Sequence, residues 1–243
     1  MHPIERLRFV ARASGLDDAT VALEATAALV AFAGDPTAMV PACRQLLSRQ
    51  PGCGPLWWAC ARLLTSTDVW ASAQETIALL EQDRTESALA AAMSGPHGAV
   101  GSPGRQGRAA EVAPTVSWAS ALGRGTVLLR RSVAPGGSAG SSEAAADQPR
   151  GTAAARWLVA PVGTRLAGPL WDSLRSALSG PGRRGAPGPG HDDPLAPRPR
   201  TPTPEFVELA SFTHVVCQDG LVAVGELAAP DCPVAPELAN LRG

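Results

Sequence analysis

One pattern repeats through the first 93 residues: a capping residue or a proline, an apolar stripe at helical spacing, and then a glycine or polar stop. Asp35 followed by Pro36 is typical of a helix start, because aspartate accepts from free N–H groups and proline has its backbone angle preset. Another of these helices begins at Asp17 or Asp18 and stops at Gly34. The segments with this pattern are 3–13, 17–33, 36–50, 55–64, 66–82 and 85–93. We therefore predict an all-helical N-terminal unit over residues 1–93.

Two adjacent tryptophans, Trp57 and Trp58, lie within the fourth of these segments. Adjacent tryptophans can stack on a ligand, but neighbours on a helix point about 100° apart. We therefore expect one ring to fill the core and the other to cover a second element.

The sequence changes character after Met93, where short apolar runs alternate with helical pieces. The pattern predicts a short helix at 117–123, buried strands at 127–129 and within 153–163, and an amphipathic helix at 166–178. Alternation of strands and helices is typical of a parallel sheet with helices on its faces. The predicted fold class is therefore α/β, with a helical cap followed by a small parallel sheet and flanking helices.

A segment rich in proline, glycine and arginine occupies residues 179–204 and has few apolar side chains to bury. We predict a disordered linker there. It separates residues 94–178, the first part of the α/β core, from residues 205–243, which complete it. This last part is expected to hold two short strands around the turn Asp219-Gly220 and a proline-stiffened tail.

The net charge of −1 is unevenly distributed. Residues 94–200 carry 13 arginines against 6 acidic residues, a net charge of +7, between two acidic ends. Such a segment can bind phosphates or nucleic acid, or it can pair with the acidic ends of the same chain. Its only aromatic residues are Trp118, Trp157 and Trp171, which disfavours nucleic acid as a partner.

Five cysteines without a CxxC pair fit neither a zinc site nor a disulfide framework, so we expect no metal and no cofactor. The N-terminal stretch lacks the apolar centre of a signal peptide. No apolar run approaches the roughly 20 residues that span a bilayer. These features predict a cytoplasmic protein with no membrane partner.

Several stretches together resemble a known group. "MHPIERLRFVARASG", "ACRQLLSRQPGCGPLWWACARLL", "WLVAPVGTRLAGPLWDSL" and "DCPVAPEL" are similar to an uncharacterised actinobacterial family. That family is related to the alpha subunit of translation initiation factor 2B and to the isomerases that act on methylthioribose 1-phosphate and ribose 1,5-bisphosphate. "FVELASFTHVVCQDGLV" is similar to the C-terminal signature of the wider group. The resemblance implies a helical cap, a Rossmann-like sheet shortened between Val112 and Gly125, and a homodimer.

In the isomerases, the strand that matches Val127–Leu129 is followed by a catalytic aspartate and a glycine-containing loop. Here no acidic residue lies between Leu129 and Glu143, and no cysteine lies between Cys60 and Cys217. Since acid–base chemistry at the sugar needs both an acid and a thiol or comparable group, we assign no catalytic residue. A relocated acid would have to be Asp172 or Glu143, and His214 is expected to be structural.

The resemblance still implies an anion-binding site, formed by the residues that follow this strand and the strand within 153–163. The candidate residues for a small phosphorylated ligand are Arg130, Arg131, Ser132, Gly136, Gly137 and Arg165. The alternative is an inert, solvated loop. A second glycine-rich loop, with glycines at 101, 104 and 107, lacks the dinucleotide-binding spacing.

The leading hypothesis is therefore a non-catalytic, initiation-factor-2B-alpha-like protein that acts as a binding or assembly module. The alternatives are a divergent aldose–ketose sugar-phosphate isomerase, a nucleic-acid-binding protein that uses its arginines, and a decayed copy whose second half folds poorly.

Overall fold

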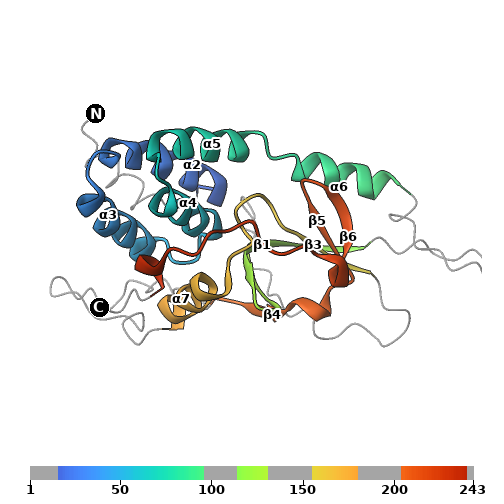
Figure 1. Ribbon diagram of the computed structural model, residues 1–243. Coiled ribbons are helices and arrows are strands. Elements are labelled where there is room, and N and C mark those ends of the chain that lie inside the picture. The colour runs from blue at the N-terminus through green and yellow to red at the C-terminus, as the bar shows by residue number, and fades with distance from the viewer. Residues whose placement is uncertain (1–15, 96–113, 131–154, 180–203, 240–243) are drawn as a thin grey trace, which may run out of the picture.

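The computed structural model describes residues 16–95, 114–130, 155–179 and 204–239, and Figure 1 shows their arrangement. The α-helices are α2 (Asp18–Leu29), α3 (Pro36–Arg49), α4 (Gly54–Thr65), α5 (Val69–Glu81), α6 (Thr85–Ser94) and α7 (Gly168–Ser179). The strands are β1 (Thr115–Gly123), β2 (Thr126–Leu129), β3 (Arg156–Val159), β4 (Phe206–Glu208), β5 (His214–Cys217) and β6 (Gly220–Ala223). Short 3-10 turns are η1 (Val30–Phe32), η4 (Leu209–Ser211), η5 (Val224–Glu226) and η6 (Pro236–Leu238).

Helices α2 and α3 begin where their predicted capping residues indicated, whereas α5 begins at Val69, three residues after its predicted start. Asp17, rather than Asp18, caps α2, because its side chain accepts from the N–H of Thr20 at 3.0 Å. Asp35 accepts from Ala38 N at 3.1 Å, and Asp68 accepts from Ala71 N at 3.0 Å. These predicted helices are confirmed; the one at 3–13 lies outside the described residues.

Within the described residues the sheet has six strands, in the order β4-β2-β1-β3-β5-β6. The pairs β1–β3 and β3–β5 are parallel, whereas β1–β2, β2–β4 and β5–β6 are antiparallel. An α/β fold is therefore confirmed, but its sheet is mixed rather than parallel throughout.

The predicted helix at 117–123 is wrong, because these residues form most of β1. A hairpin with Arg124 and Gly125 at its turn, both with positive φ (45° and 72°), joins β1 to β2. The Ala- and Ser-rich composition favours a helix locally. Burial between two neighbouring strands and beneath a helix overrides that preference, since small side chains suit such a crowded strand.

The described α-helices lie on one face of the sheet. Helices α2 to α5 and α7 share the largest buried cluster with Ala121 and Leu128 of the sheet. Helix α6 covers Trp157 and Val159 of β3 on the same face. On the opposite face, Leu158 and Val215 are covered by irregular segments around η4 and η5, and no α-helix of the described ranges contributes there.

Helix α4 approaches the sheet very closely at its first residue. A Cβ atom built on Gly54 would overlap the carbonyl oxygen of Ser120 and lie 3.0 Å from the Cβ atom of Ala121. Strand β1 has a β-bulge here, because Ala119 and Ala121 face the consecutive residues Leu129 and Leu128 of β2. Ser120 is therefore the extra residue, and the bulge turns both it and Ala121 toward the helices.

The predicted tail is extended, and we call residues 228–239 the C-terminal strap. It returns from the sheet toward α3 and α7 (Figure 1). Two of its side chains, Ala235 and Leu238, are fully buried in the largest cluster. Cys232 packs against the same cluster, and four backbone carbonyls of the strap accept hydrogen bonds from Arg165, Trp58, Arg44 and Ser173. The strap is thus held mainly through its backbone.

We predict that Gly54→Ala destabilises the protein by about 2 kcal/mol, because α4 must move away from Ser120 to admit the methyl group. The same change in a helix with open space normally stabilises. Urea unfolding followed by circular dichroism measures the effect. The matched control is Gly34→Ala, where a Cβ atom meets nothing within 4 Å. Equal stability of the two variants would show that α4 does not depend on this close approach.

Candidate functional site

The carboxyl ends of parallel strands are where open α/β sheets bind ligands. In this protein β3 and β5 are such a parallel pair, ending at Val159 and Cys217. A hollow lies beyond their ends, between the sheet and helices α4 and α5. Its lining residues are Trp58, Leu79, Ala160, Pro161, Val162, Gly163, Arg165, Cys217, Gln218, Asp219 and Asp231. We call it the strand-end crevice.

The loop after β3 is fixed against the helices. Gly163 has a φ of 78°, and a Cβ atom there would lie 3.0 Å from both Pro55 and Trp58, so a side chain is disfavoured twice. The N–H of Val162 donates to Asp83 Oδ2 at 2.9 Å, which ties the loop to the segment between α5 and α6. The wall of the crevice is therefore rigid.

Groups capable of acid–base chemistry do line the crevice. Cys217 supplies a buried thiol, and Asp219 and Asp231 supply exposed carboxylates. Part of the Arg165 guanidinium has partners within the chain, since its Nη2 donates to the carbonyls of Ala228 and Ala229 in the strap. The crevice has a volume of about 100 Å³, whereas small-molecule sites usually have about 300–1,000 Å³. The crevice by itself is therefore smaller than the usual small-molecule site.

Two larger and more open hollows, of about 430 and 440 Å³, adjoin the crevice. One lies beside Gln82 and Arg84 and shares Leu79 and Gln218 with the crevice. The other shares Asp231 with it and lies beside Arg62 of α4 and the strap.

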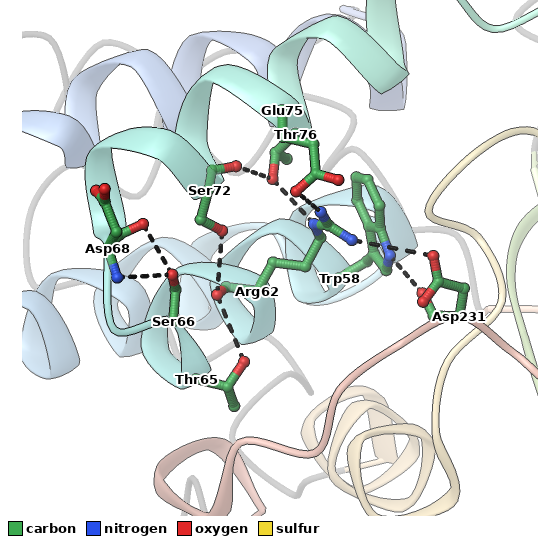
Figure 2. Close-up of polar contacts among 9 residues, drawn as sticks. All are labelled: Trp58, Arg62, Thr65, Ser66, Asp68, Ser72, Glu75, Thr76 and Asp231. Atoms are coloured by element: carbon green, nitrogen blue, oxygen red, sulfur yellow. Dashed lines mark hydrogen bonds and ion pairs between the residues drawn. The ribbon is translucent and has the colours of Figure 1, made fainter.

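Arg62 links α4, α5 and the strap, as Figure 2 shows. Its Nη2 lies 2.6 Å from Glu75 Oε2, and its Nε donates to Thr76 Oγ1 at 3.1 Å. Its guanidinium lies 5.0 Å from the ring centroid of Trp58, and Nη1 lies 4.0 Å from Asp231. Only 13% of the Arg62 side chain is exposed. Arg62 therefore serves as a structural hub, with little of its charge open to a ligand.

The two tryptophans divide their roles as predicted. Trp57 is fully buried, and its Nε1 donates to the carbonyl of Pro51 at 3.0 Å. Trp58 faces the strap, where its Nε1 donates to the carbonyl of Asp231 at 2.7 Å. Neither ring is free to stack on a ligand.

The structure separates the two predicted phosphate-binding arginines that it describes. Arg130 N donates to Trp118 O at 2.7 Å, whereas Arg165 pairs with Leu122 from the other side of β1. These partners are four residues apart, or about 13 Å along the strand. Because β2 runs antiparallel to β1, Arg130 lies at the opposite edge of the sheet from the strand-end crevice. Arg131, Ser132, Gly136 and Gly137 lie outside the described residues, so their role stays a prediction.

The other candidate groups have structural partners. Asp172 forms an ion pair with Arg124 at 3.0 Å, beside the β1–β2 turn. His214 lies edge-on to Trp157 at 6.3 Å between ring centroids. Arg156 and Arg175 lie over the rings of Phe212 and Phe206. Among the described arginines of the basic segment, Arg124 has an ion pair and Arg156 and Arg175 have ring contacts, so nucleic-acid binding by this segment stays a prediction. Glu143 and the glycines at 101, 104 and 107 are not among the described residues.

Sequence reasoning missed Asp219, Asp231 and Cys217 as lining residues of one crevice. A signal was present, because Cys217 and Asp219 end a predicted strand, but only the observed parallel pairing places that end beside Pro161. Asp231 reaches the crevice through the path of the strap, which no local pattern predicts.

Among the described residues, no three His, Cys, Asp or Glu side chains converge as a metal site would require. No helix in these same ranges is long and apolar enough to cross a membrane. Comparison of the chain with protein-family models, with curated proteins and with solved structures finds no match.

We predict that Trp58→Phe loosens the strap without unfolding the protein, because it keeps an aromatic ring but removes the donor to Asp231 O. Half-buried Cys232 lies next to this bond and reports strap opening through its rate of thiol labelling. Loss of a hydrogen bond worth about 1 kcal/mol corresponds to about a fivefold faster rate.

The control for this measurement is Trp70→Phe, whose side chain on α5 is 60% exposed. It should leave the labelling rate of Cys232 unchanged. The same rate in the Trp58 and Trp70 variants would mean that the indole does not hold the strap.

Proposed function

We propose that this protein is a non-catalytic module, similar to the alpha subunit of translation initiation factor 2B, that acts by binding a partner or by assembly. The observation that carries the proposal is the small volume of the strand-end crevice and its position beside the strap. The place where an α/β enzyme would hold its substrate has a volume of only about 100 Å³ and borders the chain's own strap.

The strap supports this reading through its contacts with Arg165 and Trp58. Arg165 is the described arginine that lines the crevice, and its Nη2 donates to carbonyls of the strap. A substrate phosphate would have to displace these bonds. A surface that binds a partner needs no such displacement, and the homodimer that the resemblance implies belongs to the same proposal.

A small phosphorylated ligand remains part of the proposal through the loop that begins at Arg130. Its test is the melting temperature of the protein with a panel of sugar phosphates and nucleotides, for the wild type and for Arg130→Ala/Arg131→Ala. A ligand present at 100 times its Kd raises the free energy of unfolding of the protein by about 2.7 kcal/mol. A shift in the wild type that the double variant loses would support an anion site. No shift with any ligand would restrict the proposal to macromolecular partners.

A second candidate, a divergent sugar-phosphate isomerase, is favoured by one observation: a thiol and a carboxylate, Cys217 and Asp219, line the same crevice. We expect no interconversion of methylthioribose 1-phosphate or ribose 1,5-bisphosphate by the purified protein, because the crevice is smaller than usual small-molecule sites. Turnover that is lost in both Cys217→Ser and Asp219→Asn would overturn the non-catalytic proposal.

A further inference from the structure

Three segments that are far apart in the sequence meet at the hydroxyl group of Ser120. Its Oγ lies 2.5 Å from Asp18 Oδ2, in the first turn of α2, and 2.7 Å from the carbonyl oxygen of Gly52, in the turn before α4. Ser120 is only 8% exposed. It points to both partners because it is the extra residue of the β-bulge in β1.

The number of protons at this contact limits its hydrogen bonds. A serine hydroxyl has one hydrogen, and both the Gly52 carbonyl and an ionised Asp18 can only accept. With Asp18 ionised, only one of the two short contacts can be a hydrogen bond. With Asp18 protonated, its carboxyl donates to Ser120 Oγ, and Ser120 donates to Gly52 O. Only the protonated state satisfies both contacts.

The surroundings of Asp18 include three titratable or charged groups. Cys53 Sγ donates to the backbone carbonyl of Asp18 at 3.4 Å, and burial together with the charge of Asp18 raises the pKa of this thiol well above its ordinary value, so the thiol stays neutral. Burial also raises the pKa of Asp18, against the Ser120 hydrogen bond and the positive charge of Arg130, while the charge of Asp17 adds to the increase. Together these effects raise the pKa of Asp18, so its carboxyl keeps its proton to a higher pH than an ordinary aspartate does.

We propose that Asp18, Ser120 and Gly52 form a proton-dependent latch that joins α2 and the turn before α4 to the bulge of β1. In the closed state the Ser120 hydroxyl donates to Gly52 O. When Asp18 loses its proton, the Ser120 hydrogen turns to the carboxylate and the Gly52 carbonyl loses its donor. The neighbouring residue, Pro51, accepts from the indole of Trp57, so Trp57 senses this release.

The pKa of the Asp18 carboxyl is higher in the folded protein than in the unfolded chain, and this sets how the stability changes with pH. Between the ordinary pKa of aspartate and that higher value, the folded state binds more protons than the unfolded state. The stabilisation by the protonated Asp18 is therefore complete at a pH below the pKa of Asp18 in the unfolded chain. This stabilisation is lost as the pH rises through the pKa of Asp18 in the folded protein.

The first test compares the wild type with Asp18→Asn, whose neutral amide can donate to Ser120 at every pH. The melting temperatures should differ least at a pH below 4. As the pH rises, the melting temperature of the wild type should fall relative to that of the variant, by about 3 °C for each unit by which folding raises the pKa of Asp18. A difference that is constant with pH, or one in which the wild type gains, would overturn the proposal.

The matched control is the neighbouring carboxyl. Although partial burial acts in the opposite direction, hydrogen bonds from Thr20 and the charge of Arg130 lower the pKa of Asp17. Asp17→Asn should therefore show the opposite trend, with the wild type gaining relative to the variant as the pH rises. The same trend in both variants would mean that loss of one charge at the start of α2, and not the latch, is responsible.

A spectroscopic test needs no comparison of stabilities. The ¹³C resonance of the Asp18 carboxyl and the indole N–H resonance of Trp57 are followed together by NMR as the pH is raised. The latch predicts a common midpoint in the wild type and no corresponding Trp57 transition in Asp18→Asn. A Trp57 resonance that stays fixed while Asp18 titrates would contradict the coupling.

Discussion

The approach of α4 to the bulge of β1 is the contact on which the rest of this structure depends. It requires glycine at residue 54, and small side chains at Ser120 and Ala121 on the facing strand. Because the two backbones meet so closely, Leu56 and Trp57 of α4 are buried in a cluster that the sheet also joins. Helices α2 to α5 and α7 therefore share one core with Ala121 and Leu128 of the sheet.

The same helix also organises the side of the molecule where a ligand site would be expected. Trp58 and Arg62, one turn apart on α4, contact the strap, and Trp58 also meets the loop after β3 at Gly163. The strap lies along this side through backbone carbonyls, so its path depends little on its own side chains apart from Ala235 and Leu238. Packing that stabilises the fold thus also narrows the strand-end crevice, which is why binding is a better proposal than catalysis.

Much of the local structure could be predicted from the sequence, because caps such as Asp35-Pro36 and the apolar runs of β3 and β5 are local signals. The strand at 117–123 could not, since only its neighbours in the sheet make Ala119 and Ala121 part of a strand. That error also placed Arg130 and Arg165 at one edge, whereas the hairpin separates them. The crevice is formed by the parallel pairing of β3 with β5 and by the path of the strap. Neither the choice of these partners nor this path can be predicted from short stretches of sequence.

The most direct test of this account is whether helices and sheet unfold as one unit. Urea unfolding of the whole chain can be followed by far-ultraviolet circular dichroism, which is dominated by the helices, and by amide exchange at Leu158 and Val216 of the sheet. A shared core predicts one midpoint and one free energy of unfolding for both. A sheet that opens at a lower urea concentration, while the helical signal is intact, would contradict the dependence of the two layers on α4.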